Sequence, residues 1–361
     1  MELEYWTLIL IVSLSVYFGI CRNANTNANN NSLINVDTSL TLKAIACMVI
    51  IAHHFSLRVE NDDLLIKLFG MGGGTWALSI FLLLSSYGIS QSEKIKKYEF
   101  KSYFKHRILK LLIPFWVCIF IVVVFYAILS PSITEEAIIS KARLGEAFPH
   151  FSDSTWMDYF LYIVGLKSIS AGNWFVLVIL YAYILFYVVS TYIGYDKRRL
   201  FVLCYSMGLI AFGLLTSYLD WPAHYWRNLW ALALGLFLSL YENELLKIKR
   251  LRFILWLFTN IVLVIDWLFI HCCDYTYIVF ANLALVSIIL FQRLFSLYSL
   301  KKRSIVLCLS LISYQIYLVH GAILNIQWYM FGSHNSLLLV VVFSILLAWL
   351  CYKLKNYVLY A

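Results

Sequence analysis

Residues 109–130 read LKLLIPFWVCIFIVVVFYAILS, and this stretch holds no charged residue after Lys110. A helix of about 20 apolar residues is long enough to cross the hydrocarbon core of a bilayer. Similar stretches recur along the chain between short clusters of charge, and the sequence is 62% hydrophobic and only 13% charged. A soluble domain needs far more polar surface to cover its core. The sequence therefore predicts a polytopic integral membrane protein.

The apolar stretches predict an all-α transmembrane bundle of about eleven spans. They lie at 5–21, 38–58, 74–91, 109–130, 172–193, 200–219, 224–241, 251–271, 275–292, 304–325 and 335–354. The N-terminus carries Glu2 and Glu4 where a signal peptide carries basic residues, so 5–21 is predicted to be a retained helix. An Asn-rich linker lies within 22–35. We therefore divide the chain into an extra helix and linker, 1–37, and a main transmembrane domain, 38–361.

The basic residues predict how the helices are oriented. Alternate loops from the third span onward are rich in Lys and Arg, and these basic clusters lie at 94–110, 197–199, 247–252, 293–303 and 353–355. Because Lys and Arg collect on the cytoplasmic side of a membrane, the alternation predicts a cytoplasmic C-terminus and, by the count of spans, an external N-terminus. It also accounts for the formal net charge of +9 without a nucleic-acid partner.

Three further segments are interpreted separately. Residues 131–171 form the longest external loop, and their apolar piece at 156–166 is too short to span, which predicts an interfacial element. The glycine-rich segment 70–74 is interpreted as a tight external turn. The His-Cys-Cys-Asp segment at 271–274 has no second pair of ligands at zinc-site spacing, so no metal site is predicted.

The second span carries the sharpest candidate site, because ionisable residues inside a membrane helix are costly. Lys43 and His54 are almost three whole turns apart, so both project from one helix face, separated by a rise of about 16 Å. In the predicted orientation, Lys43 lies near the cytoplasm and His54 lies deep, which suits a ligand whose anionic head group stays near Lys43. His53 points about a quarter-turn away. The alternatives are that Lys43 snorkels to the interface and that the histidines form helix–helix hydrogen bonds.

Polar residues also gather at the predicted cytoplasmic edge. The third span ends Ser-Ser-Tyr-Gly at 85–88, and small residues such as Ser86 permit close helix contact. Arg107 and Lys110, at i and i+3 before Pro114, are predicted to share one helix face. They either hold phosphates or only fix the topology of the chain.

The predicted external side holds a second group of candidates. Asn173 and Trp174 open a span, where Trp is commonly an interface anchor. The tenth span carries Tyr317 and His320, and its direction places His320 near the outer surface.

In this order, these elements resemble the acyltransferase 3 family of membrane O-acyltransferases. The Lys43-x10-His54 spacing is similar to the family's basic-x10-His signature, and Arg107-x-x-Lys110 resembles its Arg-x-x-Arg pair. The segments 85–88, 173–175 and 314–320 resemble its Ser-Gly-aromatic, Trp-Phe and Tyr-Leu-x-His elements. The resemblance covers about residues 38–325. It departs from the pattern where Lys replaces Arg at 43 and 110, where Ser86 replaces Gly, and where an extra helix precedes a ten-helix core.

The resemblance implies transfer of an acetyl or similar acyl group from cytoplasmic acyl-CoA to a hydroxyl of an external glycan such as capsule, O-antigen, exopolysaccharide or peptidoglycan. His54, with His53 as the alternative, would be the general base or a transient acyl carrier. The residues that would bind acyl-CoA are Lys43, Arg107, Lys110 and Ser86, and those on the acceptor side are Asn173, Trp174, Tyr317 and His320.

The implied donor, acetyl-CoA, is a substrate, and no permanently bound cofactor or metal is expected. The other expected partners are the glycan acceptor, free or lipid-linked, and the lipid of a bacterial plasma membrane. The main alternative is a polymerase or flippase for lipid-linked glycan, which has no need of a basic cluster aligned with a deep His. An ion-coupled transporter should show carboxylates at mid-membrane, and only Asp266 is a candidate.

Overall fold

The computed structural model describes residues 2–22, 32–59, 63–95, 99–129, 155–164, 173–247, 257, 261, 275–331 and 336–360. Nine helices within these residues are long and apolar enough to cross a membrane. They run through α1 (Glu2–Gly19), α2 (Val36–Ser56), α3 (Leu64–Ile95), α5 (Leu109–Leu129), α8 (Asn173–Tyr192), α9 (Arg198–Tyr218), α13 (Tyr275–Leu297), α14 (Ile305–Phe331) and α15 (Leu337–Tyr360). The prediction of a polytopic all-α membrane protein is confirmed.

Two of the eleven expected spans differ from this set. The segment predicted as a span at 224–241 forms a 3₁₀ turn, η4 (Ala223–Tyr225), and the 12-residue helix α10 (Leu229–Leu240), followed by α11 (Glu242–Leu245). Twelve residues rise only about 18 Å, less than the hydrocarbon thickness of about 30 Å. The other span, 251–271, lies outside the described residues except for 257 and 261.

The remaining elements are short. They are the helix α4 (Phe100–Tyr103), the π-helical turn η1 (Phe104–Ile108), α7 (Trp156–Val164), and the strands β1 (Ile20–Arg22) and β2 (Tyr298–Leu300). The two strands pair antiparallel and join the end of α1 to the end of α13. The helix α7 falls within the predicted interfacial element, and its Trp156 is 90% exposed.

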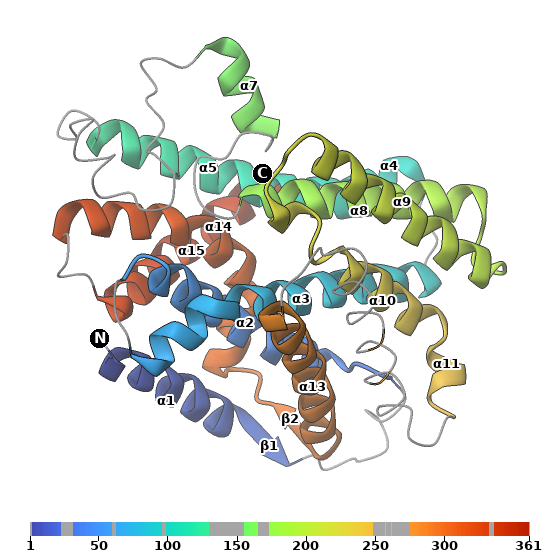
Figure 1. Ribbon diagram of the computed structural model, residues 1–361, viewed down its shortest axis with the longest axis horizontal. Coiled ribbons are helices and arrows are strands. Elements are labelled where there is room, and N and C mark those ends of the chain that lie inside the picture. The colour runs from blue at the N-terminus through green and yellow to red at the C-terminus, as the bar shows by residue number, and fades with distance from the viewer. Residues whose placement is uncertain are drawn as a thin grey trace.

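Helix α2 lies at the centre of the bundle and packs against α3 and α14 (Figure 1). Helix α3 also packs against α10 and α13, while α5, α14 and α15 contact one another and α8 pairs with α9. The histidines of α2 therefore face helices from distant parts of the chain.

The glycine-rich segment 70–74 is not a turn, so that prediction was wrong: it lies inside α3. Its glycines allow close helix packing instead. A Cβ at Gly72 would overlap the ring of Phe280 on α13, and a Cβ at Gly74 would lie 2.6 Å from Nε2 of His53 on α2. Helical conformation is retained because tertiary packing outweighs the low helix propensity of glycine. A similar close approach occurs on α10, where a Cβ at Gly235 would collide with the α3 backbone.

The N-terminal helix α1 is anchored to the main bundle. Tyr5 is fully buried, and its hydroxyl donates a hydrogen bond to the carbonyl oxygen of Ala52 on α2 at 3.3 Å. Glu4 accepts hydrogen bonds from the Ser336 hydroxyl at 2.5 Å and from the Leu337 amide at 2.9 Å. A carboxylate at this position satisfies free amides at the start of α15 and complements the helix dipole. Helix α1 thus fixes the ends of α2 and α15 relative to each other.

Candidate functional site

The candidate site is built along one face of α2. The helix begins at Val36 behind Asn35, whose side-chain oxygen accepts a hydrogen bond from the Thr38 amide at 2.7 Å. It then runs without a break to Ser56. Lys43 and His54 therefore lie on one helical face, about 16 Å apart along the axis.

His54 pairs with His320 of α14. Nδ1 of His54 lies 2.6 Å from Nε2 of His320, and the two rings stack with centroids 4.9 Å apart. His320 is completely buried, and its own Nδ1 lies 2.7 Å from the carbonyl oxygen of Tyr317. The structure thus brings together two residues that lie 266 positions apart in the sequence.

These contacts define the tautomers of both rings. A carbonyl oxygen only accepts, so Nδ1 of His320 carries a hydrogen and its Nε2 is an acceptor. Nδ1 of His54 must therefore donate to that acceptor. Nε2 of His54 is left with a lone pair and makes no hydrogen bond to any residue that the structure describes. An imidazole arranged in this way is ready to take a proton.

His53 has a different environment. Its Nδ1 donates a hydrogen bond to the carbonyl oxygen of Phe69 on α3 at 2.8 Å, and its ring packs against Gly74. His53 therefore links α2 to α3, while His54 faces α14. The two adjacent histidines contact different helices because they are about 100° apart on α2.

An aromatic cluster extends from the histidine pair. The ring of Tyr317 lies 5.7 Å from that of His320 and 4.8 Å from that of Phe175 at the start of α8. Trp174, next to Phe175, contacts His224 of η4 at 4.5 Å. The side chain of Asn173 lies outside the described part of the chain.

His224 was not singled out from the sequence, although it follows Pro222 in a turn between two apolar segments. Its charge would reach His54. Desolvation beside the neighbouring aromatic rings, together with the charge of Arg227, lowers the pKa of His224 to about 4. Its imidazole is therefore neutral at physiological pH and available as a hydrogen-bond partner.

The basic candidates Lys43 and Arg107 lie on α2 and in η1. Lys43 is half-buried and makes no hydrogen bond or ion pair with the residues described. Arg107 lies in the π-helical turn η1, donates to the Ser92 hydroxyl, and keeps a buried Nε without a partner. π-Helical turns are frequent at functional sites. Lys110, on the first turn of α5, is exposed, whereas Arg107 is half-buried.

Buried polar atoms without protein partners lie on several of these helices. Ser86 on α3 is only 1% exposed. The unpaired atoms on α3, η1 and α14 include Ser90 Oγ, Arg107 Nε and Gln315 Oε1. Buried polar groups are nearly always hydrogen-bonded, so these atoms are able to bond to water or to a bound polar molecule.

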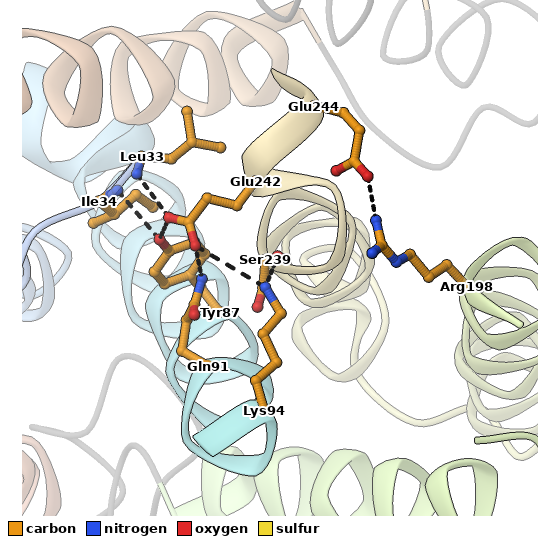
Figure 2. Close-up of polar contacts among 9 residues, drawn as sticks. All are labelled: Leu33, Ile34, Tyr87, Gln91, Lys94, Arg198, Ser239, Glu242 and Glu244. Atoms are coloured by element: carbon orange, nitrogen blue, oxygen red, sulfur yellow. Dashed lines mark hydrogen bonds and ion pairs between the residues drawn. The ribbon is translucent and has the colours of Figure 1, made fainter. Parts of the chain in front are cut away.

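A carboxylate network supports the start of α2 (Figure 2). Glu242, 8% exposed, accepts a hydrogen bond from the Leu33 amide at 2.8 Å and others from Tyr87 and Gln91. Lys94 lies 4.0 Å from the same carboxylate. Glu242 ends an apolar run and is followed by Glu244, and the sequence alone does not distinguish the buried acid from the exposed one. The network holds the chain segment entering α2 against α3 and α11.

Comparison with known proteins agrees with the resemblance seen in the sequence. The model of the acyltransferase 3 family, described as an acyltransferase domain, matches residues 38–353. No curated protein and no solved structure matches the chain. The match includes nearly all of α2 and the whole of α14, the two helices that bear the histidine pair, while α1 lies outside it. This multi-pass membrane protein therefore belongs to the acyltransferase 3 family.

Proposed function

We propose that the chain transfers an acetyl or similar acyl group from cytoplasmic acyl-CoA to a hydroxyl of an extracytoplasmic glycan. Membership of the family implies acyltransferase activity. The observation that carries the specific proposal is the open Nε2 of His54, on the same helix face as the unpaired ammonium of Lys43. A donor molecule with phosphates at one end and a thioester at the other fits this arrangement.

The donor would bind through its charges. Lys43 on α2 and Arg107 in η1 both offer cationic donors, and neither forms an ion pair with a carboxylate in the part of the chain that the structure describes. Phosphate oxygens pair well with such groups. Lys110 would add charge at the mouth of this site, and Ser86 and its neighbours would offer polar contacts along the route to His54.

The acyl transfer would take place at His54. Nε2 of His54 takes the proton of the acceptor hydroxyl while that oxygen attacks the thioester carbon. His320 holds Nδ1–H of His54 in place throughout, so the proton-accepting nitrogen stays oriented toward the substrates. The same nitrogen is suited to carry the acyl group transiently, and rapid-quench trapping of an acyl-imidazole distinguishes the two routes.

The acceptor would approach from the other end of the site. Successive ring contacts lead toward His54 through His224, Trp174, Phe175, Tyr317 and His320. Aromatic faces suit the apolar faces of sugar rings. A polymerase or flippase of lipid-linked glycan would also use such a surface. It would have no use for a proton-accepting His aligned with an anion site.

Acetyl-CoA binding by the purified chain tests the donor site. A triple variant, Lys43→Ala, Arg107→Ala and Lys110→Ala, is expected to lose saturable binding. The matched control removes the same charge from exposed positions on the same side, by Lys101→Ala, Lys105→Ala and Arg199→Ala, and should bind like the wild type. Failure of folded wild-type protein to bind acetyl-CoA, succinyl-CoA or other acyl donors would favour the polymerase or flippase.

The two histidines are tested separately in a transfer assay. Inside-out vesicles of the native membrane expose the cytoplasmic face and retain the acceptor, so release of CoA thiol from added acetyl-CoA reports transfer. We expect His54→Ala to abolish release, because it removes the proton acceptor. We expect His53→Ala only to weaken it, because His53 bonds to α3. The reverse order would overturn the assignment of His54.

A further inference from the structure

Arg58 continues the functional face of α2 beyond His54. The helix ends at Ser56, and the Arg58 amide still bonds to the Phe55 carbonyl oxygen at 3.0 Å. If the helical path is continued from His54 to Arg58, these four residues advance about 6 Å and turn about 40° more than one full turn. The half-buried guanidinium of Arg58 therefore lies about one turn beyond His54, on the side opposite Lys43.

Asn325 of α14 holds the Arg58 side chain. Nη2 of Arg58 donates to Oδ1 of Asn325 at 2.5 Å, and Asn325 is 6% exposed. The helix that supplies His320 thus also supplies the anchor for Arg58. The charge of Arg58 reaches both His54 and His320. Helix α14 therefore contributes one partner to each of two pairs, the imidazole pair with His54 and the guanidinium–amide pair with Arg58.

We propose that Arg58, anchored by Asn325, stabilises the negative charge that develops on the acyl oxygen during transfer, an inference that rests on the proposed acyl transfer. The acceptor O–H bond breaks and its proton passes to Nε2 of His54, while the acceptor oxygen bonds to the acyl carbon and the C=O pair moves onto the carbonyl oxygen. When the C=O bond reforms, the C–S bond breaks and the leaving thiolate takes the proton from His54. A fixed cation beside that oxygen stabilises the intermediate more than the neutral thioester.

The same cation lies close to the histidine pair. The charged and titratable groups whose fields reach His54 include His320 from α14, His224 from η4, His53 from α2, and Arg58 just beyond the end of α2. Arg58 is the only permanent cation among these four groups. Its positive charge is therefore present beside the site at every pH at which the enzyme works.

The test measures CoA thiol release at a range of acetyl-CoA concentrations, in inside-out vesicles containing the full chain. Arg58→Gln is expected to lower kcat about 100-fold, the effect of losing one charge-stabilising group, with little change in the KM for acetyl-CoA. Arg58→Lys keeps the charge and should recover part of the lost kcat. Lys67→Gln removes one exposed charge from the first turn of α3 and serves as the control.

The outcomes separate this inference from the proposed function. Wild-type kcat in Arg58→Gln, or a loss of kcat that Arg58→Lys does not reduce, would overturn the role of Arg58 and leave it a tether between helices. An equal loss in Lys67→Gln would also overturn it, because the effect would then be one of general charge. Absence of thiol release by the wild type would instead overturn the proposed function before any variant is compared.

Discussion

Exchange of His320 for Gln or Asn tests the histidine pair most directly. The end of a Gln side chain reaches about where the imidazole Nε2 lies, whereas an Asn side chain ends near the position of Nδ1. His320→Gln therefore keeps an acceptor for the Nδ1–H of His54, which now lies 2.6 Å from Nε2 of His320. His320→Asn keeps only a donor to the Tyr317 carbonyl oxygen, now 2.7 Å from Nδ1.

The size of the effect follows from the lost hydrogen bond. A buried donor left without its partner costs about 1–3 kcal/mol. His54 escapes this cost by moving its proton to Nε2, which removes the lone pair needed for catalysis. Because about 1.4 kcal/mol corresponds to a factor of ten, the population of the His54 tautomer with a free Nε2 lone pair falls about 5- to 150-fold. We expect kcat of His320→Asn to fall in that range and kcat of His320→Gln to fall by less than about 5-fold.

Thiol release in inside-out vesicles gives kcat, and acetyl-CoA binding by the purified variants controls for folding. Both variants should bind acetyl-CoA like the wild type, because His320 lies at the opposite end of the site from Lys43. Equal losses in the two variants would refute the tautomer argument, and so would full activity of His320→Asn.

Three further predictions concern the scaffold and are measured by thermal unfolding of the detergent-purified chain. Gly235→Ala should destabilise the chain by about 1–3 kcal/mol, because the added Cβ collides with the α3 backbone. Gly88→Ala should stabilise the chain by up to about 1 kcal/mol, because the added Cβ meets no atom within 4 Å. The opposite order of stabilities would contradict the packing. Glu242→Ala should cost about 3–5 kcal/mol, because it leaves the partners of a buried carboxylate without it. Glu244→Ala should leave the stability nearly unchanged, because its ion pair is exposed. Equal effects of the two substitutions would count against the network. Tyr5→Ala should cost about 3–5 kcal/mol by opening a cavity beside α2, and an unchanged melting temperature would show that α1 does not support the main domain.

The local features of the fold could be predicted from the sequence. Hydropathy is a property of contiguous residues, so nine of the eleven expected spans correspond to described helices. The alignment of Lys43 with His54 is equally local, because helix geometry alone sets it. The short α10 was overestimated because its flanking aromatic residues extend the apolar run beyond the helix.

The parts that were missed depend on contacts between distant helices. No local pattern indicates that His320 contacts His54, because a rotation of α14 about its axis would change its contacts without changing its hydropathy. Segment 70–74 was interpreted as a turn because glycine has the same local signal in a turn and in a close helix contact. Only the packed neighbours, Phe280 and His53, reveal the difference.

Acyl transfer and acetyl-CoA binding depend on different contacts of α2. Lys43 and His54 belong to one helix and Arg58 follows two residues after its end, so their mutual distances are set largely by local geometry and are hard to disturb. His320 and Asn325 come from α14, so the proton-accepting nitrogen and the guanidinium depend on how α14 packs against α2. A shift between these helices of about 1 Å would break both contacts while leaving the donor site intact. Substitutions between α2 and α14 are therefore expected to impair acyl transfer before they impair acetyl-CoA binding, whereas those between α2 and α3 should affect both together.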